Sequence, residues 1–248
     1  MPSVLEWNDV YYTFPGTSMP ALRGASLRLE YGQRVVLLGR NGAGKSTLLL
    51  HANGILRPSA GTVHIAGTPL DYSQHGLRIA RRQVGLVFQN PDDQLFSASV
   101  AQDISFGPLN MGLSITATRQ RVSQVAVRCG VSDLLDRPTH ALSGGQKARV
   151  ALAGVLAMEP RVILADETIA GLDPWMQQQV FVIFNQLVAE GTTVLLATHA
   201  LDVARHWADL VVVMESGCVV AADTPAQVFA DQTLCELLGP PDPWKETG

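Results

Sequence analysis

The chain has 248 residues, of which 47% are hydrophobic and 16% charged, and its formal net charge is −4. This composition is typical of a globular protein with a substantial core and excludes a disordered chain. The acidic balance offers no basic field for nucleic acid, so no nucleic-acid partner is expected. No run approaches the roughly 18 apolar residues of a membrane-spanning helix. Any role at a membrane must therefore come through a partner.

Strand-like and helix-like segments alternate along most of the chain. Strands are predicted over 4–12, 25–30, 35–38, 62–65 and 84–88. Between residues 90 and 141 polar turns separate helix-like segments, notably 116–130, which predicts a small helical insert. Apolar runs of β type return at 162–165, 193–197 and 210–214, between helical segments. Continuous apolar strands between helices predict a parallel sheet covered on both faces.

The two ends and the cysteines add little. The first residues lack the basic and apolar regions of a signal peptide. Residues 239–248 begin Gly-Pro-Pro-Asp-Pro and are predicted to form a peripheral tail beyond a domain that spans 3–238. Cys129, Cys218 and Cys235 are scattered without metal-ligand spacing, which predicts free thiols in a reducing compartment.

A glycine-rich segment follows the predicted strand 35–38 and precedes a helix-like run. It reads Gly39-Arg40-Asn41-Gly42-Ala43-Gly44-Lys45-Ser46-Thr47 and fits the pattern G-x-x-x-x-G-K-[ST] of phosphate-binding loops. In this strand–loop–helix context the loop amides and the helix N-terminus form an anion site. Lys45 adds a charge for the β- and γ-phosphates, and the Ser46 hydroxyl is a Mg²⁺ ligand. The context disfavours a mere glycine-rich turn with a surface lysine, so nucleotide binding is predicted.

A second segment, Leu142-Ser143-Gly144-Gly145-Gln146, stands at the start of another predicted helix. Ser143 and Gln146 have the spacing of a capping box. Gly144 and Gly145 leave the first helical amides open to a phosphate. Taken alone, this segment is better interpreted as an ordinary capped helix.

Two carboxylates, Asp166 and Glu167, follow the apolar run 162–165. Ligands of open α/β sheets lie beyond the carboxyl ends of the strands, so this pair is expected beside the glycine-rich loop. Asp166 fits the Walker-B role of holding Mg²⁺. Acidic residues at a strand end are commonplace, and a functional role for Asp166 and Glu167 is predicted only because the chain also has the glycine-rich loop.

The glycine-rich loop combined with Leu-Ser-Gly-Gly-Gln resembles the ATP-binding cassette (ABC) family, over about residues 5–225. The resemblance implies an α/β fold: a P-loop NTPase (RecA-like) core with a mainly parallel sheet. It also implies an N-terminal antiparallel β subdomain and an α-helical subdomain inserted at 90–141. In the family the Leu-Ser-Gly-Gly-Gln segment is the signature motif, and residues 143–146 accordingly contact nucleotide.

The same resemblance assigns roles to single residues. Glu167 matches the catalytic glutamate that polarises the attacking water, and Gln89 matches the Q-loop glutamine that touches the metal and that water. His199 matches the switch histidine at the γ-phosphate, and Asp173 matches the D-loop (170–173) along the dimer seam. Among aromatic residues, Phe14 aligns best with the ring that stacks on adenine, and Tyr12 is the close alternative.

These assignments together give the expected site. Catalysis is expected from Lys45, Gln89, Glu167 and His199, and the metal ligands from Ser46, Gln89 and Asp166. One departure is that the family usually reads Asp-Glu-Pro-Thr where this chain reads Asp166-Glu167-Thr168-Ile169. The change frees the backbone at 168 and replaces a hydroxyl with an apolar group. Both carboxylates are retained, so ATP hydrolysis is still predicted.

Three functions compete for such a chain: the ATPase of a membrane transporter, a soluble ABC ATPase acting on ribosomes or DNA, and a small-molecule kinase. Kinases lack the signature segment. Ribosome-acting relatives usually carry two cassettes and chromosome-type relatives carry long coiled coils, whereas this chain has neither. The importer interpretation is therefore favoured, with two ATPase subunits that hold ATP and Mg²⁺ between them.

The segment Phe88-Gln89-Asn90-Pro91-Asp92-Asp93-Gln94-Leu95-Phe96, with 103–110 beyond it, resembles energy-coupling factor importers, most closely their cobalt/nickel-type ATPases. This implies a peripheral position on the cytoplasmic face of the membrane, a transmembrane coupling subunit, and a separate membrane subunit that selects the metal or vitamin. Another ABC importer class is the alternative.

Overall fold

The computed structural model describes residues 3–169 and 171–239. Residues 240–248 of the predicted tail (239–248) and Ala170 of the D-loop lie outside the described residues. The described strands are β1 (Ser3–Tyr12), β2 (Leu22–Glu30), β3 (Arg34–Leu38), β4 (Ala60–Ile65), β5 (Thr68–Pro69), β6 (Val84–Val87), β7 (Val162–Asp166), β8 (Thr193–Ala197), β9 (Leu210–Glu215) and β10 (Cys218–Asp223).

The described helices are α1 (Lys45–Ala52), α2 (Gln74–Gln83), α3 (Val100–Asn110), α4 (Ile115–Arg128), α5 (Gly144–Leu156), α6 (Pro174–Ala189), α7 (Leu201–His206), α8 (Pro225–Ala230) and α9 (Gln232–Leu238). Short 3-10 turns lie at Pro91–Asp93, Ser132–Leu134 and Thr139–Ala141. None of the described helices is long and apolar enough to cross a bilayer.

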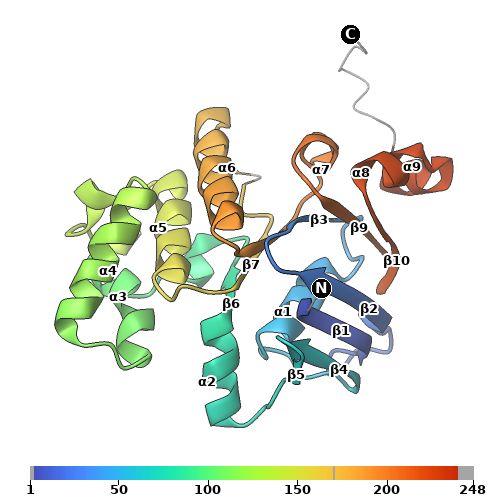
Figure 1. Cartoon of the computed structure of the whole chain (residues 1–248), viewed down its shortest axis with the longest axis horizontal. Coiled ribbons are helices and arrows are strands. Elements are labelled where there is room, and N and C mark those ends of the chain that lie inside the picture. The colour runs from blue at the N-terminus through green and yellow to red at the C-terminus, as the bar shows by residue number, and fades with distance from the viewer. Residues whose placement is uncertain (1–2, 170, 240–248) are drawn as a thin grey trace.

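The strands form two sheets of different kinds. A six-stranded sheet has the order β10-β9-β3-β8-β7-β6 and is parallel except where β10 pairs antiparallel with β9. A four-stranded antiparallel sheet has the order β2-β1-β4-β5. Helices α3 and α4 stand at the far side of the molecule from this second sheet (Figure 1). The predicted fold class is therefore confirmed.

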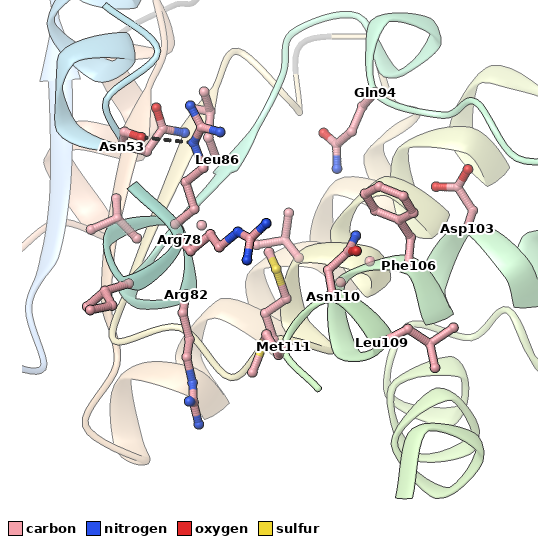
Figure 2. Close-up of a pocket in the computed structure, with 18 of the residues that line it drawn as sticks. Asn53, Arg78, Arg82, Leu86, Gln94, Asp103, Phe106, Leu109, Asn110 and Met111 are labelled. Atoms are coloured by element: carbon pink, nitrogen blue, oxygen red, sulfur yellow. Dashed lines mark hydrogen bonds between the residues drawn. The ribbon is translucent and has the colours of Figure 1, made fainter. Parts of the chain in front are cut away.

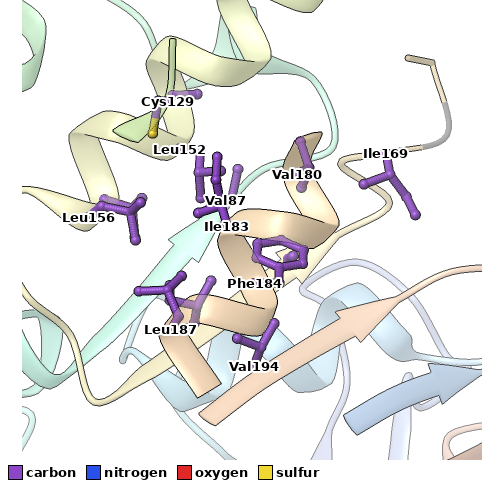
Figure 3. Close-up of a cluster of buried hydrophobic side chains, with 14 of the residues drawn as sticks. Val87, Cys129, Leu152, Leu156, Ile169, Val180, Ile183, Phe184, Leu187 and Val194 are labelled. Atoms are coloured by element: carbon purple, nitrogen blue, oxygen red, sulfur yellow. The ribbon is translucent and has the colours of Figure 1, made fainter. Parts of the chain in front are cut away.

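The central strands divide their side chains between two cores. In β3, Val36 and Leu38 belong to one cluster while Val35 and Leu37 belong to the other, because successive side chains of a strand point to opposite faces. The first cluster packs α5 and α6 on the sheet (Figure 3). The second packs α1 and the antiparallel sheet on the opposite face. Burial on both faces explains why these strands read as unbroken apolar runs.

Helix α1 is held between the two sheets by a directional contact as well as by packing. The buried Trp7 of β1 donates from its indole Nε1 to the carbonyl oxygen of Leu48 over 3.0 Å. Leu48 and Leu49 are fully buried in the same core. This contact ties the antiparallel sheet to the helix that follows the glycine-rich loop.

The sequence analysis missed several elements at the edges. It began β2 at residue 25, whereas the strand starts at Leu22, and it did not recognise β10. Most residues of β10 are exposed or half-buried, so the strand lacks the apolar run that marked its neighbours. Helix α2 was also missed, because its sequence is rich in arginine and glutamine and buries only Ala80.

The apolar residue that replaces the family's usual hydroxyl lies in the core. Ile169 is 3% exposed and belongs to the cluster that packs α6 on the sheet (Figure 3). We expect Ile169→Thr to lower the free energy of unfolding by about 2 kcal/mol, since it buries a hydroxyl and removes packing. Urea denaturation measures this. Ile115→Thr, at a position 67% exposed, is the matched control and should change stability by less than about 0.5 kcal/mol. Equal effects at both positions would contradict the core assignment.

Candidate functional site

The glycine-rich loop joins the carboxyl end of β3 to the start of α1. Gly44 caps the helix in a left-handed conformation, with φ of 102° and ψ of 6°. A Cβ at Gly44 would lie 2.8 Å from the carbonyl oxygen of Ala21, and one at Gly39 would lie 2.5 Å from that of Met214. Side chains at these two positions would therefore collide with backbone. The glycines allow the loop to fold tightly over the end of the sheet with its amides available.

Lys45 is buried at the base of the loop, with 7% of its surface exposed. Its Nζ donates to the carbonyl oxygen of Gly39 over 2.8 Å and lies 3.7 Å from Oε1 of Glu167. Burial lowers the pKa of Lys45, while the carboxylates of Glu167 and Asp166 act in the opposite direction. A partly desolvated cation fixed by the loop backbone is well suited to an anionic ligand.

Glu167 is the point at which the predicted motif residues meet. Its Oε1 lies 2.6 Å from Nε2 of His199, and its Oε2 accepts from Nε2 of Gln89 over 3.4 Å. Glu167 itself has a φ of 47°, which is unfavourable for a residue with a side chain. Strained backbone of this kind concentrates at functional sites. The strain here turns the carboxylate from the end of β7 toward the loop lysine.

Asp166 lies one residue earlier and more deeply. Its Oδ1 is buried and has no hydrogen-bond partner among the described residues. Burial raises the pKa of Asp166, and a hydrogen bond with the Ser46 side chain acts in the opposite direction. An unpaired carboxylate oxygen beside a hydroxyl is a donor set that a hard cation such as Mg²⁺ prefers. The residues present therefore fit the metal that the sequence predicted.

A cavity of about 560 Å³ lies at this edge of the sheet, and Asp166 is not part of its described lining. Its lining includes Phe14, the loop residues 41–47, Gln89, Glu167 and His199. The sequence analysis missed one lining residue, Ala21, since an alanine in a turn carries no chemical signal. Tyr12 stands behind Phe14, with 4.9 Å between ring centroids, so Phe14 is the better placed of the two candidate aromatic residues. Arg40 turns away and donates from Nε to the carbonyl oxygen of Leu237 over 2.9 Å.

The predicted capping box is present at the start of α5. Ser143 Oγ accepts from the Gln146 amide over 3.4 Å, and Gln146 Oε1 accepts from the Ser143 amide over 3.0 Å. A Cβ at Gly145 would lie 2.3 Å from Sδ of Met176, so the first turns of α5 and α6 are closely packed. Asp173 caps α6 by accepting from the Met176 amide over 2.9 Å.

The described lining of the 560 Å³ cavity includes none of Ser143, Gly144, Gly145, Gln146 and Asp173. The signature segment and the D-loop residue thus lie together with each other but apart from the glycine-rich loop. Within a single chain, the structure brings together only part of the predicted nucleotide site.

A second hollow of about 880 Å³ lies between α2 and α3 (Figure 2). Its α2 side carries the basic residues His75, Arg78, Arg81 and Arg82, and Figure 2 shows Arg78 pointing into the space between the helices. Its α3 side carries two exposed aromatic rings, Phe96 and Phe106, packed edge to face with 4.7 Å between centroids. We call this hollow the docking groove. An exposed aromatic pair in a groove of this size is typical of a protein-binding surface.

The fold and the 560 Å³ cavity define a P-loop nucleotide-binding protein. The carboxylate of Glu167 lies in this cavity beside the lysine of the phosphate-binding loop. The comparisons with known proteins go further. The family model described as "ABC transporter" matches residues 22–170. This chain belongs to the ABC transporter family.

Several relatives are similar over nearly the whole chain. The energy-coupling factor transporter ATP-binding protein EcfA of Methanothermobacter thermautotrophicus is 45% identical over 93% of this chain and 74% of its own length. The cobalt import ATP-binding protein CbiO of Rhodobacter capsulatus is 47% identical over 94% of this chain and 82% of its own.

Solved structures agree with this assignment. The structure of cbiO1 from Clostridium perfringens, part of the ABC transporter complex cbiONQ, has a TM-score of 0.82 and 42% identity over 95% of this chain and 94% of its own. The cassette MJ0796, solved as a dimer in a post-hydrolysis state with ADP and Pi, has a TM-score of 0.82 and 25% identity over 89% of this chain and 98% of its own.

The buried Asp166 generates a stability prediction. We expect Asp166→Asn to raise the free energy of unfolding of the nucleotide-free protein by about 1 kcal/mol at neutral pH, because it removes a buried charge. Since the pKa of Asp166 is raised in the folded state, the gain should vanish in acid, where the carboxyl is protonated in both states. It should grow as the pH rises from the ordinary aspartate value through the raised folded-state pKa. Urea denaturation across this pH range measures the effect.

The control for this measurement is Asp93→Asn, which changes an exposed carboxylate in the Pro91–Asp93 turn and should show no such gain. A lower stability of Asp166→Asn at neutral pH would contradict the view that the charge of Asp166 is not fully compensated in the folded protein.

Proposed function

We propose that this chain is the ATP-binding and ATP-hydrolysing subunit of an energy-coupling factor type importer. The observation that carries the proposal is the convergence of Lys45, Gln89 and His199 on the carboxylate of Glu167 beside the glycine-rich loop. The names of the relatives EcfA and CbiO support the importer class. Cobalt is the favoured cargo, supported by the cobalt import protein among these relatives.

In the proposed mechanism, the amides of residues 41–46 and the start of α1 hold the phosphates of ATP, with Lys45 at the β- and γ-phosphates. Phe14 stacks on the adenine. Ser46 and Asp166, with Gln89 nearby, would hold Mg²⁺, which would neutralise phosphate charge. Glu167 accepts a hydrogen bond from the attacking water and takes its proton. The water oxygen bonds to the γ-phosphorus as the bond from that phosphorus to the bridging oxygen breaks and ADP leaves.

His199 and Gln89 position the reacting groups. Both side chains are exposed to the cavity and both reach Glu167, so they can hold the carboxylate in place while a water binds. As the γ-phosphate enters, Lys45 and His199 exchange part of their interaction with Glu167 for the phosphate oxygens. The carboxylate then remains free to accept the proton.

The nucleotide site is completed by a second subunit. The α5 start of one subunit, capped by Ser143 and left open by Gly144 and Gly145, faces the γ-phosphate on the loop of its partner, and Asp173 lies at the seam. This arrangement explains why these residues do not line the 560 Å³ cavity of their own chain. The dimeric structure of the related cassette MJ0796 supports the arrangement. Hydrolysis removes the contacted phosphate and the dimer loosens.

The docking groove is proposed to receive the transmembrane coupling subunit. It lies beside α3, in the helical segment 90–141, and its edge includes Phe88 and Gln94 on either side of Gln89. Movement of a partner helix in the docking groove can thereby reach the glutamine at the nucleotide. In this proposal the subunit is a peripheral protein at the membrane, and a separate membrane subunit selects the cargo.

Substitution of Glu167 tests the catalytic role. We expect Glu167→Gln to reduce ATP turnover by roughly 10²- to 10⁴-fold, because the amide cannot take a proton, while ATP affinity is retained. With ATP present the variant should accumulate as a dimer in light scattering. Glu190→Gln, which changes a surface carboxylate paired with Arg128, is the control and should behave as wild type. Unchanged turnover in Glu167→Gln would remove Glu167 from catalysis.

Substitution in the docking groove tests the membrane partner. The tagged wild-type chain should purify from detergent-solubilised membranes with a multi-spanning subunit, and Phe106→Glu should lose it while ATP binding stays unchanged. Val127→Glu is the matched control, since Val127 is 70% exposed on α4 and does not line the groove. Recovery of ribosomes or DNA in place of a membrane subunit would contradict the importer function. Retention of the subunit by Phe106→Glu would contradict the docking groove.

A further inference from the structure

The imidazole ring of His51 packs behind Tyr12 and Phe14, the two aromatic residues predicted from the sequence. Phe14 and Tyr12 pack edge to face, with 4.9 Å between centroids and an interplanar angle of 86°. Tyr12 packs in the same manner on His51, at 4.8 Å and 75°. The rings therefore form a continuous row from the cavity to the core. Phe14 is 39% exposed, Tyr12 is half-buried, and His51 is fully buried.

His51 belongs to α1, the helix whose first residues are Lys45, Ser46 and Thr47. Its Nδ1 lies 2.7 Å from the carbonyl oxygen of Thr47, one turn earlier. A carbonyl oxygen only accepts, so Nδ1 carries the proton and Nε2 carries the lone pair. Nε2 has no partner among the described residues. Burial lowers the pKa of His51, so the ring is a neutral aromatic group that Thr47 fixes in one orientation.

The three rings come from two segments of the chain, and only Phe14 lines the cavity. Tyr12 ends β1, Phe14 lies in the following turn, and His51 lies at the far end of α1 from the loop. The backbone of Phe14 is fixed by Thr17, whose amide and hydroxyl both donate to the Phe14 carbonyl oxygen. The orientation of the Phe14 ring depends on Tyr12, and that of Tyr12 depends on His51.

We propose that His51 is a positioning residue for the nucleotide base. It acts through Tyr12 to hold Phe14 in the orientation that stacks on adenine. The proposal rests on the proposed function, because it takes the 560 Å³ cavity as the ATP site. Its consequence is that one helix positions both ends of the ligand. The N-terminus of α1 holds the phosphates, and its last turn sets the surface for the base.

The test compares two ligands that differ in the base. ATP contacts both the loop and Phe14, whereas inorganic tripolyphosphate contacts the loop alone. We expect His51→Leu, which fills a similar volume without a ring, to weaken ATP binding about three- to tenfold, the size expected for loss of one aromatic contact. Binding of Mg²⁺-tripolyphosphate should be unchanged. In turnover, KM for ATP should rise and kcat should stay constant, because the base contact is the same in the ground and transition states.

Matched variants separate positioning from general stability. His51→Phe restores a ring and should recover most of the ATP affinity. His206→Leu is the matched control. It removes the same kind of hydrogen bond, from Nδ1 to the carbonyl oxygen of Asp202 one turn earlier, at an exposed site on α7. It should leave the affinities for ATP and tripolyphosphate unchanged. In a double-mutant cycle, His51→Leu should add little once Tyr12→Leu has removed the intermediate ring.

The outcomes separate this proposal from the proposed function. Equal weakening of ATP and tripolyphosphate by His51→Leu, or no weakening of either, would overturn the positioning role while leaving the ATP site intact. Additive effects of Tyr12→Leu and His51→Leu would also overturn it. A wild-type protein that binds neither ligand, or a Lys45→Ala variant that still binds both, would instead overturn the assignment of the cavity as the ATP site.

Discussion

The contact between Lys45 and Glu167 sets the geometry on which the rest of the site depends. The two side chains come from segments more than a hundred residues apart in the sequence. Lys45 is fixed by its hydrogen bond to the carbonyl oxygen of Gly39. Glu167 has a left-handed backbone conformation directly after β7. The parallel strands β3 and β7, which lie on either side of β8, bring both segments to one edge of the sheet, where ligands of α/β proteins bind. A lysine alone would bind any anion, and a carboxylate alone would repel it. Together in a half-desolvated cavity, they favour a phosphate that arrives with a cation and a water molecule to be activated.

Contacts at the same edge of the sheet connect the 560 Å³ cavity to the docking groove. Gln89 follows β6, touches Glu167, and precedes the segment that forms one wall of the docking groove. Phe88 on one side of Gln89 and Gln94 on the other both line that groove. The Gln94 side chain also donates to the Ala151 carbonyl oxygen of α5, the helix that begins with the signature segment. A shift at the cavity can therefore pass along short, packed contacts to both the docking groove and α5.

Sequence reasoning predicted those parts of the molecule that short-range patterns encode. The glycine-rich loop, the Ser143–Gln146 capping box and the unbroken apolar strands each follow from local chemistry, and the structure has all three. It did not predict β10 or α2, because exposed elements carry little apolar periodicity. Nor did it find His51, which looks like any histidine on a helix until the fold places Tyr12 against it. Contacts of this kind depend on which segments the two sheets bring together, so they cannot be predicted from the spacing of residues within one segment.

The charges at the site carry a cost that binding can offset. Burial shifts the pKa values of Asp166 and Lys45 away from the charged forms, so pairing among the protein's own groups does not fully compensate for lost hydration. Asp166 keeps an unpaired buried oxygen, and Glu167 keeps an unfavourable backbone. A ligand that supplies a metal to Asp166 and phosphate oxygens to Lys45 would compensate the buried charges of these two side chains. It would leave the unfavourable backbone of Glu167 unchanged. Ligand binding would recover the free energy that these buried charges cost. In the proposed function, that gain would help to close two subunits against each other, and it would be lost once the γ-phosphate leaves.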